Sequence, residues 1–109
     1  MSEVTRERLL SLASPIVEAV ESEAFGGTVY VRRMGVAGRD GFIAETDGGK
    51  NMGNFKAELL VRCLCDKDGK LLLTKADADT IGQHPAEAID PIVAAAWRLN
   101  GLGEDESGK

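Results

Sequence analysis

Aromatic residues, cysteine and histidine are all scarce in this chain of 109 residues. Aromatic side chains make up only 5% of the sequence, so the core must be built largely from Leu, Val, Ile and Ala. Two cysteines and one histidine leave little material for a metal site or for a nucleophile with its base. No apolar run approaches the roughly 20 residues of a membrane span, and the sequence MSEVTRERLL is unlike a secretory signal. We therefore expect a protein of the reducing cytoplasm.

Basic residues are outnumbered: 13 Lys and Arg stand against 18 Asp and Glu, which gives a formal charge of −5. Proteins that bind nucleic acid neutralise phosphates with Lys and Arg, and an acidic domain repels them. The basic residues here are scattered, and Arg32-Arg33 is the only adjacent pair. The composition therefore predicts no nucleic-acid partner and no attachment to an anionic membrane surface.

Motifs for metal binding or catalysis fail when their spacing is checked. Cys63 and Cys65 have no paired C-x-x-C spacing, so buried, reduced thiols are the simpler interpretation. The stretch 66–69, Asp-Lys-Asp-Gly, does not fit a calcium loop in either register and predicts a turn instead. The stretch 48–50, Gly-Gly-Lys, lacks the remaining positions of a phosphate loop. We predict no catalytic, cofactor-binding or metal-ligating residues, and no enzymatic activity.

The length fits a single domain, which we place at residues 1–102, with residues 103–109 as a disordered acidic tail. Two runs rich in β-branched residues, 16–20 and 28–34, are joined through Phe25-Gly26-Gly27 and predict a β-hairpin. Since a lone hairpin is marginal in water, it must lean on helices or on a partner's strand. The predicted fold is α+β and mainly helical, with this N-terminal hairpin packed on a bundle of about four short helices.

Two early segments have a helical pattern. The first runs from Arg6 to Ala13 and ends before a proline. The second runs from Val36 to Glu45, where the apolar positions are 36, 37, 43 and 44, although Gly38 and Gly41 each disfavour a helix by about 1 kcal/mol. The glycine-rich stretch 47–53 predicts a flexible loop.

The stretch from Phe55 to Cys65 has an apolar stripe at helical spacing, and we favour a helix capped by Asn54. On that helix Lys56, Glu58 and Arg62 would face outward, with Glu58 and Arg62 paired. The alternative is a second hairpin, with strands at 60–65 and 70–74 around the turn at 66–69.

Two helices are expected near the C-terminus. Thr74 and Asp77 fit a capping box for a short helix that ends at Gly82. A final helix covers roughly Pro85 to Asn100, and Pro91 either begins a fresh helix or kinks a continuous one.

Several blocks of the sequence resemble one known family. The most distinctive is Leu59–Lys70, and the others are residues 29–40, an acid-rich helix ending at Ile81-Gly82, and Arg98–Leu102. Together they are similar to the tail assembly chaperones of bacteriophages with long, non-contractile tails. The resemblance implies a non-enzymatic protein of the infected host's cytoplasm that binds the tape measure protein, keeps it soluble and helps recruit tail tube subunits. It also implies absence from the mature virion and, for many members, a longer product made by ribosomal frameshifting.

If this resemblance holds, an apolar surface should receive a partner helix. We place that protein-binding surface at five apolar residues, although core packing is the competing role for each: Leu60, Leu64, Ile92, Val93 and Trp97. The alternative function is a structural head–tail connector or minor tail component of the virion. A homo-oligomer is also open, because the hairpin lacks a sheet of its own.

Overall fold

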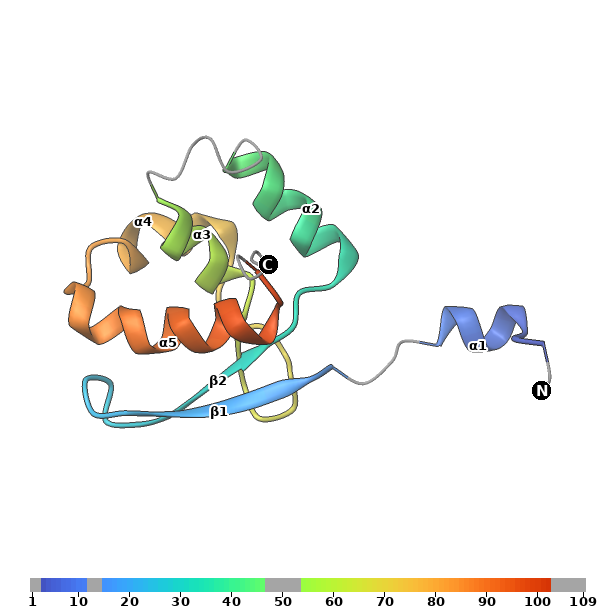
Figure 1. Cartoon of the computed structure of the whole chain (residues 1–109), viewed down its shortest axis with the longest axis horizontal. Helices are drawn as coiled ribbons and strands as arrows, with labels where there is room; N and C mark the ends of the chain where they lie inside the picture. Colours follow the sequence, from blue (N-terminus) through green and yellow to red (C-terminus); the bar gives the residue numbers. More distant parts are fainter. Residues whose placement is uncertain (1–2, 12–14, 47–53, 103–109) are drawn as a thin grey trace.

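The computed structural model of the protein describes residues 3–11, 15–46 and 54–102. Within these ranges, the chain forms short helices and three short strands (Figure 1). The order is α1 (Arg6–Leu10), β1 (Val17–Ser22), β2 (Gly27–Arg32), α2 (Val36–Glu45), α3 (Phe55–Val61), β3 (Leu64–Cys65), the 3-10 turn η2 (Lys75–Asp77), α4 (Ala78–Ile81) and α5 (Ala86–Leu99). The predicted α+β, mainly helical fold is confirmed.

The predicted hairpin is present as β1 and β2. The two strands pair antiparallel over six residues each, from Val17 opposite Arg32 to Ser22 opposite Gly27. Gly26 closes the turn with a φ of 75°, a conformation that glycine adopts without steric cost. In Figure 1, helices α2 to α5 all lie on one side of the hairpin, and α5 runs directly above it. The hairpin thus packs against helices, which supply the burial that an isolated hairpin lacks.

The segment after α3 departs from our prediction of one helix from Phe55 to Cys65. The helix ends at Val61, and the chain then enters β3, which pairs with Tyr30 and Val31 of β2. Cys65 also bridges to Leu71, so the alternative hairpin is observed over this part. The Asp66 carboxylate accepts the backbone N–H groups of residues 68 and 70 at 2.9 and 3.0 Å, which fixes the turn. Side-chain capping of this turn, together with pairing to β2, overrides helix propensity here.

Helix α2 has the predicted bounds, but the apolar residues that gave its helical pattern do not face the core. The apolar positions 36, 37, 43 and 44 are all exposed, and Phe42 is the residue that enters the core. A Cβ at Gly41 would lie 3.4 Å from the guanidinium of Arg62, an ordinary van der Waals distance, so α2 packs directly over the Arg62 side chain. Our prediction that Glu58 and Arg62 face outward is wrong for the same reason. Their 2.8 Å ion pair is largely covered, with side chains 15% and 13% exposed.

The two C-terminal helices follow the sequence pattern. The Thr74 N–H donates to the Asp77 carboxylate at 2.8 Å, as a capping box requires, and Gly82 ends α4. Helix α5 is continuous through Pro91, so no fresh helix begins there. Pro91 is exposed, and the Glu87 carbonyl that loses its helical partner lies on a solvated turn where water can replace it.

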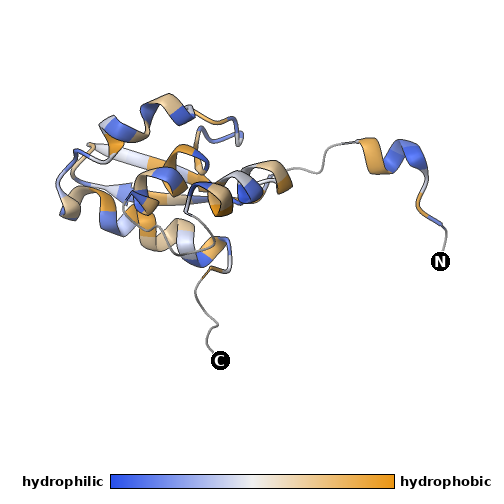
Figure 2. Cartoon of the chain, turned by 90° about the horizontal axis from the view of Figure 1, so that it is seen from above, coloured by the Kyte–Doolittle hydropathy of each residue, from blue (hydrophilic) through white to orange (hydrophobic). Residues whose placement is uncertain are grey.

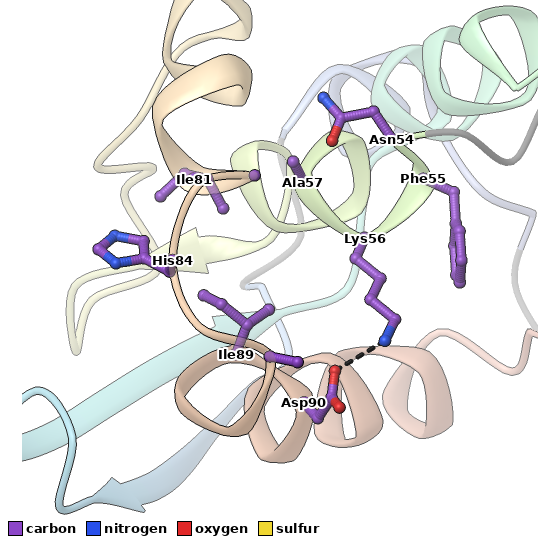
Figure 3. A pocket seen from close by; sticks show the side chains of 10 residues that line it. Asn54, Phe55, Lys56, Ala57, Ile81, His84, Ile89 and Asp90 are labelled. Carbon is purple, nitrogen blue, oxygen red and sulfur yellow. Dashed lines mark hydrogen bonds and ion pairs between the residues drawn. The ribbon is translucent and has the colours of Figure 1, made fainter.

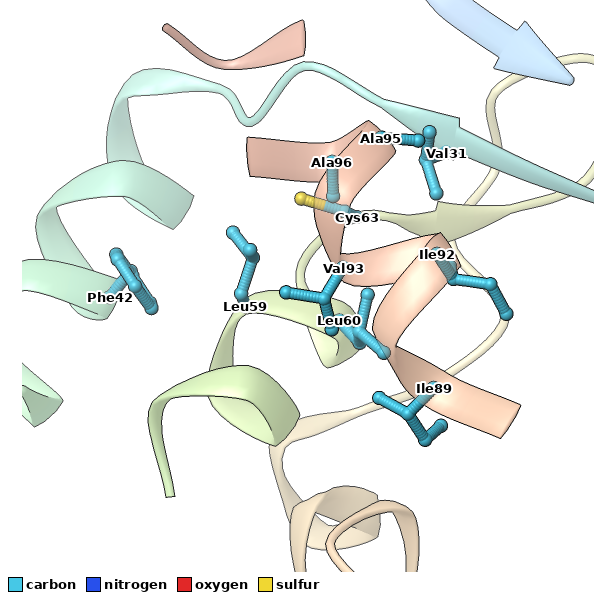
Figure 4. Close-up of a cluster of buried hydrophobic side chains, with 10 residues drawn as sticks. All are labelled: Val31, Phe42, Leu59, Leu60, Cys63, Ile89, Ile92, Val93, Ala95 and Ala96. Carbon is cyan, nitrogen blue, oxygen red and sulfur yellow. The ribbon is translucent and has the colours of Figure 1, made fainter. Parts of the chain in front are cut away.

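The core is the space between the sheet, α3, α5 and the end of α2 (Figure 4). Leu59, Leu60 and Val31 are fully buried at its centre. The ten buried residues of this cluster are Val31, Phe42, Leu59, Leu60, Cys63, Ile89, Ile92, Val93, Ala95 and Ala96.

The N-terminal helix α1 stands apart from the rest of the chain. In Figure 1 it lies at the opposite end of the molecule from the hairpin turn, and Figure 2 shows both hydrophilic and hydrophobic residues on it. None of its residues is buried. The predicted loop at 47–53 and the predicted tail at 103–109 lie outside the described residues.

Candidate protein-binding site

One hollow is lined mainly by apolar side chains, and we call it the apolar groove. It lies among β2, β3, the segment after β3, α4 and the first half of α5, and it encloses about 520 Å³. It is lined by Phe25, Thr28, Val29, Tyr30, Leu64, Cys65, Asp66, Lys67, Leu72, Leu73, Ile81, Ile89 and Ile92.

The groove exists because β3 is short. This strand covers β2 only at Tyr30 and Val31, so the part of β2 nearer the hairpin turn has no third strand beside it. Val29 and Leu64 pack against the core but stay partly exposed, and Leu72 is 63% exposed. An open strand edge beside apolar side chains can receive a segment of another polypeptide.

A second hollow of about 260 Å³ adjoins the groove (Figure 3). It lies between α3, the turn before α5, and α5 itself, and it shares Ile81 and Ile89 with the groove. Lys56 and Asp90 form a 2.7 Å ion pair across it, with side chains 45% and 50% exposed. Because these two charges satisfy one another in water, they form a solvated bridge rather than a desolvated acid–base pair.

A third hollow of about 350 Å³ continues along α5 towards its C-terminal end. It shares Phe55 and the Lys56–Asp90 pair with the second hollow and adds Val93 and Trp97. The Phe55 and Trp97 rings meet edge to face, with centroids 5.6 Å apart. The three hollows therefore follow one another along the side of α5, and the groove has the largest apolar lining.

An acidic hollow borders the groove on its other side, between the hairpin turn and α5. Glu21, Glu23 and Glu87 line it, its volume is about 500 Å³, and it shares Ile92 with the groove. The remaining lining residues are Ser22, Ala24, Ala88 and Pro91, so no basic residue lines it. We call these three glutamates the acidic flank.

The five residues predicted to bind a partner divide into core and surface. Leu60 is fully buried and lines no hollow, so it belongs to the core. Ile92 and Val93 are also core residues, although each has an edge on a hollow. Leu64 and Trp97 are partly exposed, in the groove and in the third hollow. The structure thus leaves these last two as accessible candidates, and binding by them stays a prediction.

Sequence reasoning missed Leu72, the most exposed apolar residue of the groove, and its neighbour Leu73. Both belong to a run of three leucines that begins one residue after the turn at 66–69. Successive side chains of an extended segment point to opposite sides, so such a run cannot bury all its members against one core. That run was the available signal for an exposed apolar surface.

The two thiols are structural. Cys63 is 0% and Cys65 1% exposed, and neither forms a disulfide. Burial raises the pKa of Cys63 to about 12, against a smaller opposing effect of the Asn100 side chain, and burial raises the pKa of Cys65 as well. Within residues 3–11, 15–46 and 54–102, no three His, Cys, Asp or Glu side chains gather as a metal site would need.

None of the helices in the described ranges is both long and apolar enough to cross a membrane. No protein-family model matches the chain, and no curated protein matches it either. Among solved structures, the chain is similar to the tail assembly chaperone of bacteriophage HK97. The TM-score is 0.63 at 14% sequence identity, over 86% of this chain and 89% of that one. The two proteins share a fold across most of both chains.

Proposed function

We propose that this chain is a bacteriophage tail assembly chaperone that binds the tape measure protein and keeps it soluble during tail morphogenesis. The observation that carries the proposal is the fold shared with the HK97 chaperone over most of both chains. The apolar groove, with an exposed Leu72 at its surface, supports a binding role.

The chemistry of the groove suits such a client. A long helical protein that exposes an apolar stripe aggregates unless another surface covers the stripe. The groove offers apolar side chains from β2, β3 and α5 and continues along α5 through two further hollows. A helix laid along this path would bury its stripe against Ile89, Leu72 and Trp97. The net charge of −5 would limit self-aggregation of the loaded complex.

On this proposal the protein acts in the cytoplasm of the infected bacterium, makes and breaks no covalent bond, and is absent from the finished virion. It also helps to bring tail tube subunits to the tape measure protein, through a frameshifted longer form where one is made.

Co-expression tests the proposal directly. A tape measure protein from the same genome should be recovered in the soluble fraction with the wild type and in inclusion bodies without it. Leu72→Asp should abolish the effect, because it places a charge in the groove at a position that is already 63% exposed. Val36→Asp is the matched control, since Val36 is 82% exposed on α2 and lines none of the hollows described above. Equal insolubility of the tape measure protein with and without the wild-type chain would refute the proposal.

Mass spectrometry of purified virions separates this proposal from its alternative. A head–tail connector or minor tail component would persist in the particle, whereas an assembly chaperone would not.

A further inference from the structure

The chain contains one asparagine that is followed directly by glycine, at Asn100-Gly101. In such a pair the backbone nitrogen of the glycine can attack the side-chain carbonyl carbon of the asparagine, because glycine has no Cβ to hinder the approach. A five-membered succinimide ring forms: the backbone N–H proton goes to the solvent, and the side-chain NH₂ group takes up a proton and leaves as ammonia. Water then opens the ring at either carbonyl, which gives an aspartate or an isoaspartyl link. The reaction therefore needs only water and a pair that is free to close the ring.

In the folded protein the attacking nitrogen is held away from its target. Asn100 follows the last turn of α5, and Gly101 adopts a left-handed φ of 65°. The Gly101 N–H donates to the Arg98 carbonyl at 3.1 Å. The next N–H, that of Leu102, donates to the Trp97 carbonyl at 3.0 Å, which completes the Schellman motif that ends many helices. Because ψ of Asn100 is 1°, the Gly101 nitrogen lies beside the backbone nitrogen of Asn100 and is turned away from its side chain.

The side chain under attack is fixed as well. The Oδ1 atom of Asn100 accepts the Met34 N–H at 2.8 Å. Its Nδ2 group donates to the carbonyl of Ala96 at 2.8 Å and to that of Arg32 at 3.4 Å. Ring closure must rotate the bond between Cα and the carbonyl carbon of Asn100, and it must release these hydrogen bonds. The reaction therefore requires that the end of α5 first opens locally.

The product does not fit the place that Asn100 occupies. A carboxylate has no proton to donate, so an aspartate would turn a negative oxygen towards the carbonyls of Ala96 and Arg32 and leave both without their donor. An isoaspartyl link lengthens the main chain by one carbon atom, so the two hydrogen bonds of the Schellman motif cannot both form. Either product should keep the end of α5 from closing again.

We propose that Asn100-Gly101 is a deamidation site that the closed end of α5 protects, and that local opening of this end converts it irreversibly. A chain that has reacted in the open state cannot restore its original helix end. Trp97, which lines the third hollow, lies three residues before Asn100, so conversion also loosens part of the surface along α5. The modification is a property of this chain alone and does not depend on the tape measure protein.

Peptide mapping by mass spectrometry on the purified full-length chain tests the proposal. The chain is kept at pH 8 and 37 °C in buffer or in guanidinium chloride, and trypsin then releases residues 99–109, with Asn100, and residues 51–56, with the other two asparagines. In guanidinium chloride, residues 99–109 should gain the mass that exchange of an amide for a carboxylate brings, and residues 51–56 should change far more slowly. In buffer, Asn100 should convert at least about tenfold more slowly, since only the locally open fraction reacts. Equal rates in the two samples, or no conversion in guanidinium chloride, would overturn the proposal.

A pair of double variants tests whether opening controls the rate. The exposed side chains of Arg33 and Arg39 donate to the last two backbone carbonyls of the helix end, at 2.9 and 3.1 Å. Arg33→Ala with Arg39→Ala should raise the rate in buffer several-fold and leave the rate in guanidinium chloride unchanged. The matched control, Arg6→Ala with Arg8→Ala, alters two arginines of α1 and should convert like the wild type. The proposal is wrong if loss of Arg33 and Arg39 leaves the rate in buffer unchanged.

The variant Asn100→Asp reports what the modification does to the fold. Its urea midpoint should be about 1 M lower than that of the wild type, because two carbonyls lose their donor. A midpoint equal to that of the wild type would contradict our statement that the product cannot restore the helix end. All of these measurements use the purified chain, so none of their outcomes bears on the co-expression result with the tape measure protein.

Discussion

Replacing Leu60 with alanine tests whether this leucine belongs to the core or to the binding surface. Leu60 lies at the centre of the core, and its exposed fraction is 0%. Deleting a buried leucine side chain costs about 2–5 kcal/mol, because transfer free energy is lost and a cavity is left. A domain of this size has a total stability of about 5–15 kcal/mol, so the variant should lose a large share of it. Leu72→Ala, at a position 63% exposed, should cost less than about 1 kcal/mol.

Urea unfolding followed by circular dichroism measures this difference. With a slope of about 1.5 kcal/mol per molar urea, a loss of 3 kcal/mol lowers the midpoint by about 2 M. The Leu72→Ala midpoint should stay within about 0.7 M of the wild type on the same slope. At low temperature without urea, folded Leu60→Ala should still solubilise the tape measure protein, whereas Leu72→Asp should not. If Leu60→Ala unfolds like the wild type, or if Leu72→Ala is destabilised equally, our division of these leucines between core and groove is wrong.

Four further predictions concern the thiols and the turn at 66–69. Cys63 and Cys65 should react with a thiol reagent at pH 8 far more slowly in the native protein than in urea, because burial keeps both thiols protonated; fast native labelling would contradict their burial. The pKa of Cys63 is raised from 9.0 to about 12, so stability should fall as the pH rises through that range, and Cys63→Ala should flatten the alkaline limb of a plot of stability against pH. Gly69→Ala should lose about 1–3 kcal/mol in urea unfolding, since Gly69 has a φ of 87° and an added side chain would lie 2.3 Å from Pro15. Backbone hydrogen bonds, chiefly from the N–H of residue 70, lower the pKa of Asp66, so its contribution to stability is present above about pH 4 and is lost on acidification. Asp66→Ala should therefore flatten the acid limb of a plot of stability against pH. An unchanged acid limb would refute the role of the turn.

The elements that the sequence predicted well are those whose signals are local. The hairpin through Gly26, the capping box at Thr74 and the stop at Gly82 each depend on a few neighbouring residues, and all three are present. The bounds of α2 are also as predicted.

The features that the sequence did not predict depend on distant partners. Helix α3 gives way to β3 because β2 offers a free edge at Tyr30 and Val31, more than 30 residues earlier in the chain. The glycines of α2 lie against distant or non-helical partners, Gly38 against Met34 and Gly41 against the Arg62 side chain, which the pattern of α2 alone does not reveal. The sequence did not predict the groove for the same reason. Helical periodicity indicates which residues can be buried, but it does not show where a short strand leaves part of the neighbouring strand unpaired.

Asn100, the residue after α5, ties the end of that helix to the segment that joins β2 to α2. Its side chain accepts from the Met34 N–H at 2.8 Å and donates to the Ala96 carbonyl at 2.8 Å, while its own carbonyl accepts from Arg39. On a ribosome, β1 and β2 emerge long before α5, the helix that covers them. The hairpin must therefore wait with one apolar face uncovered until α5 has been synthesised and has left the ribosome.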